Sequence, residues 1–271
     1  LKMVQALDDL ASFQPKFLLP FTDALVFLFT EMAGSEAVPQ AVRVAALNFF
    51  VTYAEKNGMA LKKCAAFADS TLVALFRAVM ADVTPELSDD SDEQASRRDM
   101  EGAVISLLPS LAGALGAKFM YARYGPLIVE GLRSEDYRAQ YTALLFAGTL
   151  AEDTQQHFSA ELPHLLALVL PLLASDNDKV LHGCLACVAL LCSEYAPSMQ
   201  REYHAQILPQ LLRLLDVEAG VQPRISERAV SCLINFAREL IPAADAEDAD
   251  EEGDEGADYA HIFEPHVPLL A

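Results

Sequence analysis

A pair of cysteines is the first feature of this sequence whose spacing could support chemistry. Cys184 and Cys187 form a C-x-x-C pair, with Cys192 nearby, and such pairs bind metal ions or exchange disulfides. The alternative is that they are small core residues one helical turn apart. The sequence has no second C-x-x-C and no Gly-Pro active-site turn at this pair. We therefore interpret the pair as part of a helical core in a reducing compartment.

Other catalytic motifs are missing from the sequence. The six histidines form no H-E-x-x-H or similar metal-binding motif, and we expect most of them at surfaces or helix ends. Neither the G-x-S-x-G of hydrolases nor the G-x-x-x-x-G-K-[ST] of phosphate-binding loops is present. We predict a protein that is not an enzyme and that has no metal or cofactor. No uninterrupted run of about 18 apolar residues suggests a membrane span.

Acidic residues are concentrated in an insertion at 82–98, between two expected helices. Its carboxylates could clamp a basic segment of a partner, whereas composition alone favours a solvated loop. A second acidic segment, at 242–258, is expected to be a loop between repeats because it has nine acids, no base and no large apolar residue over 245–258. The candidate contact residues of the insertion are Glu86, Asp89, Asp90, Asp92 and Glu93.

The overall charge of the chain limits the kinds of partner that it can bind. The 271 residues carry 19 basic and 39 acidic side chains, a net charge of −20. Such a chain is a poor match for nucleic acid, whose phosphates require basic patches. It favours basic partners, although an acidic surface can also serve solubility alone.

The segment 161–197 shows the kind of element that would position the candidate residues. It contains two apolar helices, 163–174 and 179–195, joined by a turn, Ser175 to Asp178, that offers N-capping oxygens. Similar second helices open at Val42, Tyr137 and Ile225. The second helix of the segment opens at Val180, about 43 residues after Tyr137 and about 45 residues before Ile225, and a two-helix period of about 40–47 residues is typical of HEAT repeats.

The predicted fold is therefore all-α: a right-handed HEAT-repeat (armadillo-like) solenoid of antiparallel helix pairs. We expect one continuous array over 1–271, with about five full repeats and a partial repeat at each end. The sequence begins without Met and stops inside an expected helix, which suggests a fragment. The expected helices are 1–13, 15–32, 39–56, 61–81, 100–116, 121–132, 135–153, 163–174, 179–195, 199–216 and 223–241.

A lane of polar side chains along the second helices is the other candidate site. Positions six, ten and fourteen residues after each opening residue share one helix face. In stacked repeats these faces would lie side by side on the concave surface, where asparagine and glutamate could bind an extended peptide and its lysines. The alanines at these positions of 135–153 are expected to pack. The candidates are Asn48, Thr52, Glu194, Asn235 and Glu239.

Three features together resemble one protein family. The hairpin at 161–197, the helix end SCLINFAREL at 231–240 and an acidic insertion inside one repeat are similar to the importin-beta (karyopherin-beta) family, closest to its importin beta-3 branch. The similarity extends over essentially the whole sequence, as a central fragment of such a receptor.

The resemblance implies a nuclear import receptor that shuttles between cytoplasm and nucleus. Such receptors bind cargo carrying nuclear localisation signals on the concave face, release it when Ran binds in its GTP form, and contact nucleoporins. The main Ran-binding repeats of the family lie nearer the N-terminus, so this segment alone should bind Ran weakly. The resemblance also implies that the acidic insertion contacts Ran or cargo. The alternative is a HEAT-repeat scaffold or regulatory subunit that does not respond to Ran.

Overall fold

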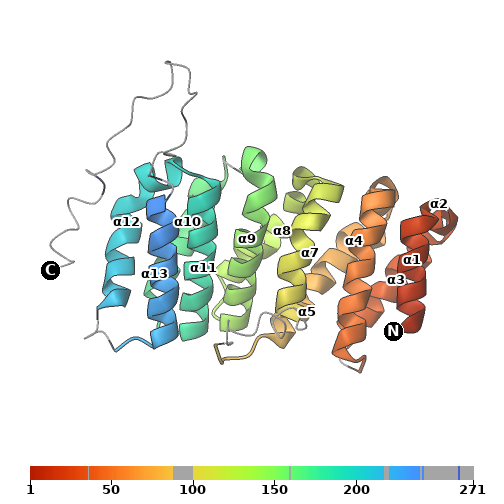
Figure 1. Cartoon of the computed structure of the whole chain (residues 1–271), viewed down its shortest axis with the longest axis horizontal. Coiled ribbons are helices and arrows are strands. Elements are labelled where there is room, and N and C mark those ends of the chain that lie inside the picture. Colours follow the sequence, from red (N-terminus) through yellow and green to blue (C-terminus); the bar gives the residue numbers. More distant parts are fainter. Residues whose placement is uncertain are drawn as a thin grey trace, which may run out of the picture. The chain divides into compact units, whose positions relative to one another are not determined.

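The protein is helical throughout the part that the structure describes, and no strand occurs there (Figure 1). This computed structural model describes residues 1–35, 37–87, 100–158, 160–216, 220–238, 240 and 262, with the backbone alone at 100, 101 and 152–158. The chain divides into two compact units, Leu1–Leu165 and Leu166–Ala271. One continuous array over 1–271 remains a prediction.

Helices of the first unit alternate between two layers. One layer contains α1, α4, α7 and α9, which contact one another in that order, and the other contains α3, α5 and α8. We call the layer of α1, α4, α7 and α9 the α4 layer and the layer of α3, α5 and α8 the α5 layer. The elements are α1 (Lys2–Phe13), α2 (Pro15–Leu18), η1 (Leu19–Phe21), α3 (Thr22–Gly34), α4 (Gln40–Lys63), η2 (Phe67–Thr71), α5 (Leu72–Asp82), α7 (Met100–Leu115), α8 (Ala117–Leu132) and α9 (Tyr137–Phe158).

Aromatic rings fill the space between the two layers of the first unit. Phe29 of α3 stacks on Phe49 of α4 with ring centroids 3.9 Å apart, and Phe49 stacks in turn on Tyr53 at 5.5 Å. A second group joins Phe76, Tyr124 and Phe146 in edge-to-face contacts, each at 4.9 Å. Because such rings bury large areas, they account for much of the hydrophobic stabilisation of this unit.

Two expected helices of the first unit are divided differently from the prediction. The range 15–32 is not one helix, because it is broken into α2, η1 and α3 around Pro20, which lacks an N–H to continue the ladder. The predicted boundary at 56–61 is also wrong: α4 continues to Lys63 through a kink at Asn57. The Asn57 amide donates to the Pro15 carbonyl at 3.0 Å, a contact that fixes the kink.

Another second helix of the first unit matches its prediction closely. The expected helix 100–116 is α7, which ends at Leu115 before Gly116. Gly116 has a φ of 82°, a left-handed conformation that favours glycine, and it makes the tight turn into α8.

The second unit repeats the helix pairing. α11 and α13 lie side by side, and α12 packs against α13 and η3. As predicted, the turn before α11 supplies its cap, because Asn177 Oδ1 accepts from the Val180 N–H at 3.1 Å. The elements are α10 (Leu162–Val169), inside which the division between the units falls, η3 (Leu170–Ala174), α11 (Asp178–Glu194), α12 (Ser198–Leu215) and α13 (Pro223–Arg238).

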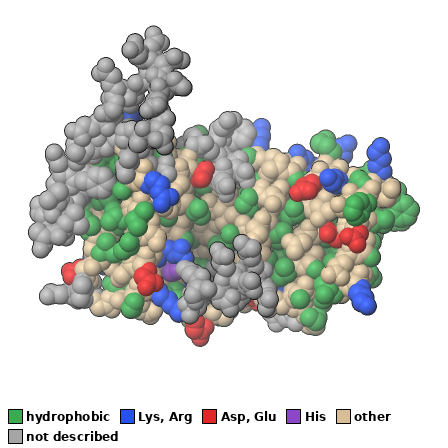
Figure 2. Space-filling model, viewed as in Figure 1, with side chains coloured by type: hydrophobic (Ala, Val, Ile, Leu, Met, Phe, Trp, Pro, Cys, Tyr) green, Lys and Arg blue, Asp and Glu red, His purple; other side chains and the backbone are tan. Residues whose placement is uncertain are grey.

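Exposed apolar side chains gather at the N-terminal end of the first unit. Phe13, Phe17, Phe21 and Phe27 are each at least half exposed, and Figure 2 shows hydrophobic side chains at this end. By length and composition Pro15–Gly34 could cross a membrane, and the bent pair Gln40–Lys63 and Phe67–Asp82 passes the same test together. Core helices of soluble proteins also pass this test, so the finding is weak evidence.

Candidate functional site

The predicted polar lane begins on α4. Asn48 is exposed and Thr52 is half-buried one turn later, while their neighbours Phe49, Phe50 and Tyr53 are buried in the core. The Thr52 hydroxyl donates to the backbone carbonyl of Asn48 at 3.4 Å. This bond does not use the side-chain amide of Asn48. The helix therefore presents an amide donor and acceptor away from the core, as the lane requires. Whether it binds a ligand stays a prediction.

The sequence prediction overlooked the contribution of α7. This helix packs beside α4 and exposes Ile105, Ser106 and Ser110. Both helices have neighbours on two sides and the α5 layer behind, so their exposed stripes face the same way. Pro109 lacks the N–H that would normally bind the Ile105 carbonyl. That proline was visible in the sequence and was the signal that could have identified this stripe.

The lane does not continue as an exposed stripe on α9. Ala143, Ala147 and Ala151 are at most 1% exposed, which confirms that these alanines pack. Small side chains at this spacing let neighbouring helices approach closely. Of the two helices of the first unit on which the lane was predicted, α4 therefore presents its lane positions outside the core and α9 does not.

In the second unit the predicted residues lie at the ends of two adjacent helices. Glu194 ends α11, Asn235 lies in the last turn of α13, and both are half-exposed. Leu190, one turn before Glu194, is 41% exposed and adds an apolar contact that the prediction did not include. Glu239, the fifth candidate of the lane, lies outside the described residues.

The acidic insertion is described only at its start. Glu86 is exposed in the segment 83–87 that follows α5. The other candidates, Asp89, Asp90, Asp92 and Glu93, lie outside the described residues, as does the acidic segment 242–258. Their role as contacts stays a prediction.

The cysteines are core residues, as interpreted from the sequence. All five are buried and none forms a disulfide, and Cys184 Sγ donates to the Val169 carbonyl at 3.3 Å. Burial raises the pKa of Cys187 and of Cys232 to about 12. No group of three or more metal-ligating side chains occurs in the part of the chain that the structure describes.

His182 is an exception to the expectation that most histidines lie at surfaces or helix ends. It is 8% exposed, and its Nε2 accepts from the Arg228 side chain at 3.2 Å, which connects α11 to α13.

Thiol alkylation checks the buried state of the cysteines. In the folded protein at pH 8 we expect iodoacetamide to modify none of the five within an hour, and all five after unfolding in guanidinium. Because burial raises the pKa of four of these thiols, their modification rate should stay low up to about pH 10, whereas that of an ordinary thiol rises through about pH 8.5. The four are Cys64, Cys184, Cys187 and Cys232. Mass spectrometry counts the modified thiols. Rapid modification of Cys184 or Cys187 in the folded protein would contradict the core assignment.

The comparisons with known proteins find similarity to two importins. No protein-family model matches the sequence. The chain is 25% identical over 241 residues to importin subunit beta-3 of Saccharomyces cerevisiae, covering 86% of this chain and 22% of that protein. It is 24% identical over 222 residues to human importin-4, covering 78% of this chain and 20% of that protein.

Solved structures show the same fold. The crystal structure of Kap121p matches with a TM-score of 0.80 and 20% identity, covering 98% of this chain and 25% of that one. Kap121p bound to RanGTP also gives 0.80 at 20% identity, and Kap121p bound to Pho4p gives 0.78 at 20%, each over 98% of this chain and 25% of that one. The predicted all-α HEAT-repeat class is thereby confirmed. The chain spans about a fifth of the length of the curated relatives it matches.

Proposed function

We propose that this chain, whose predicted resemblance to the importin-beta family is confirmed by these matches, is a cargo-binding segment of a nuclear import receptor. The sequence similarity to two importins over most of the chain carries the proposal. The receptor would shuttle between cytoplasm and nucleus, bind basic cargo and nucleoporins, and release cargo on binding RanGTP mainly through repeats outside this segment.

The contact surface in the first unit is the α4–α7 stripe, which comprises Asn48, Thr52, Ile105, Ser106 and Ser110. Its amide and hydroxyl groups suit the main chain of an extended peptide, and the Ile105 carbonyl lacks its usual donor because of Pro109. A peptide N–H could supply that donor. Ile105, 44% exposed, offers an apolar contact between these polar groups.

In the second unit Glu194 would attract a lysine of the cargo and Asn235 would bind its main chain. Exposed ion pairs contribute about 0–1 kcal/mol each and hydrogen bonds about 0.5–1.5 kcal/mol. Affinity therefore comes from several modest contacts, and it should fall as salt screens the charges. The net charge of −20 favours basic cargo over acidic proteins.

The proposal is tested with the full-length protein, used to capture partners from cytosol with and without Ran loaded with a non-hydrolysable GTP analogue. We expect basic nuclear proteins to bind and to be released by Ran. If the same partners are retained whether or not Ran is present, the alternative of a HEAT-repeat scaffold or regulatory subunit is favoured instead.

A triple variant tests the residues of the lane. Asn48→Ala, Glu194→Gln and Asn235→Ala together should weaken binding of a captured basic cargo by about 10–30-fold, since they remove about 2 kcal/mol of contacts. The matched control changes two amides and one carboxylate on α12: Gln206→Ala, Gln210→Ala and Glu202→Gln. Equal affinities for both triple variants, measured by fluorescence anisotropy, would refute the lane while leaving the receptor function standing.

A further inference from the structure

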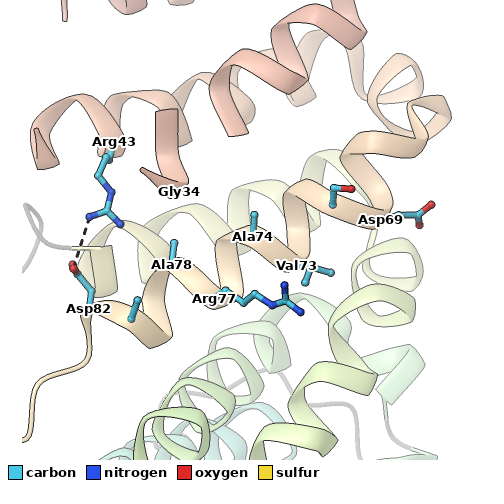
Figure 3. Close-up of a pocket in the computed structure, with 10 residues that line it drawn as sticks. Gly34, Arg43, Asp69, Val73, Ala74, Arg77, Ala78 and Asp82 are labelled. Carbon is cyan, nitrogen blue, oxygen red and sulfur yellow. Dashed lines mark ion pairs between the residues drawn. The ribbon is translucent and has the colours of Figure 1, made fainter. Parts of the chain in front are cut away.

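A cavity of about 490 Å³ in the first unit is lined mainly by η2 and α5, with Gly34 of α3 and Arg43 of α4 at one end (Figure 3). No residue of the α4–α7 stripe lines it. Small residues, Gly34, Ala74, Ala78 and Ala81, form much of its wall. With so little side-chain bulk, the main chain of a ligand can approach α5 closely. The chemistry of the cavity comes from charged residues at its ends and along α5.

Arg43 is a buried cation with unused donors at one end of this cavity. Its side chain is 8% exposed, and of its five N–H donors only Nε–H is hydrogen-bonded, to the Ala33 carbonyl at 2.9 Å. Its Nη1 lies 3.8 Å from the nearest oxygen of Asp82, which is too far for a hydrogen bond. Figure 3 shows the guanidinium at the edge of the cavity, between Gly34 and Asp82. The two Nη atoms are not among the buried polar atoms without a partner, so their N–H donors are open to solvent and accessible to an acceptor that enters the cavity.

Arg77 supplies a second cation along the wall. It is exposed, and within the described part of the chain it makes no hydrogen bond or ion pair. Asp69, at the other end of the cavity, is already 3.7 Å from Arg123 of α8. The cavity therefore has an unneutralised guanidinium in a protein whose net charge is strongly negative.

We propose that this cavity binds a carboxylate of an acidic segment of a partner protein, held by Arg43 and Arg77. Arginine binds carboxylates through two parallel N–H bonds, which suits the free Nη donors of Arg43. The small residues of α5 admit the flanking main chain. Asp82, whose side chain is 37% exposed, competes weakly for Arg43 and turns toward solvent when the ligand enters. This site is separate from the lane for basic cargo, so an experiment can refute one of the two proposals without refuting the other.

Peptide binding tests the proposal on the full-length protein. The probe is a fluorescein-labelled Gly-Ala-Asp-Glu-Ala-Gly peptide, and its Asn-Gln counterpart is the neutral control. Fluorescence anisotropy at low salt should show the acidic peptide binding at least about tenfold more tightly than the neutral one. Arg77→Gln should weaken it about five- to tenfold, and Asp82→Asn should strengthen it about threefold by removing the competing carboxylate.

Matched variants separate the site from general charge effects. Arg133→Gln, directly after α8, changes the net charge as Arg77→Gln does, and Asp9→Asn on α1 changes it as Asp82→Asn does. Both lie at exposed positions outside the cavity. Both should leave the affinity for the acidic peptide unchanged. Equal binding of the two peptides, equal losses from Arg77→Gln and Arg133→Gln, or weaker binding by Asp82→Asn would each overturn the proposal. So would binding of inorganic phosphate without any binding of the acidic peptide.

Discussion

Replacing Gln200 with glutamate is expected to lower the free energy of unfolding of the second unit by about 3–5 kcal/mol. Gln200 lies in α12 and is fully buried. Its Nε2 donates to the Cys192 carbonyl at 2.9 Å and to the Phe236 carbonyl at 3.5 Å. Both carbonyls belong to the last four residues of their helices, α11 and α13. One amide therefore connects three helices.

The glutamate variant turns this donor into a buried carboxylate facing two carbonyl oxygens. The loss should be larger at pH 8 than at pH 5, because burial raises the pKa of the introduced carboxyl and its protonated form can still donate one hydrogen bond. Hydrogen exchange of peptides from α11, α12 and α13 is the measurement, since helical repeats need not unfold in one step. Gln206→Glu, on an exposed site of the same helix, is the control and should change stability by less than about 0.5 kcal/mol. Equal protection in both variants would contradict the role of Gln200.

The sequence predicted best the features that depend on neighbouring residues. The hairpin at 161–197 has its turn as predicted, and the cap comes from Asn177, one of the four turn residues expected to offer N-cap oxygens. An N-cap needs only a side chain three residues before the N–H that it binds. The buried cysteines follow from helical spacing in the same way. The acidic insertion, whose candidate residues lie mostly outside the described part, stays a prediction.

Features that depend on contacts between distant residues were not predicted. The extension of α4 through Asn57 rests on a bond to Pro15, 42 residues away. The cavity lined mainly by η2 and α5 depends on Arg43 binding the end of a different helix at Ala33. Periodicity gives the faces of single helices, and it does not say which carbonyl a buried side chain will reach.

The close approach of α8 and α9 gives the second large effect. Gly131, one residue before the end of α8, is buried. A Cβ added there would lie 2.8 Å from the Ala143 Cβ and 2.9 Å from the Ala139 carbonyl oxygen of α9. Both are shorter than van der Waals contact, and the oxygen belongs to the backbone. A side chain at 131 must therefore push the two helices apart and disturb the edge-to-face contact of Tyr124 with Phe146.

Gly131→Val should accordingly lower the free energy of unfolding of the first unit by about 3 kcal/mol, and Gly131→Ala by about 1–2 kcal/mol. The matched control is Gly113→Ala, near the end of α7, where nothing lies within 4 Å of the added Cβ. It should stabilise the unit by up to about 1 kcal/mol, because alanine favours helix more than glycine does. Thermal and urea unfolding of both alanine variants measure the contrast. Since the same chemical change is expected to act in opposite directions, equal effects would show that α8 and α9 do not pack as closely as the structure describes.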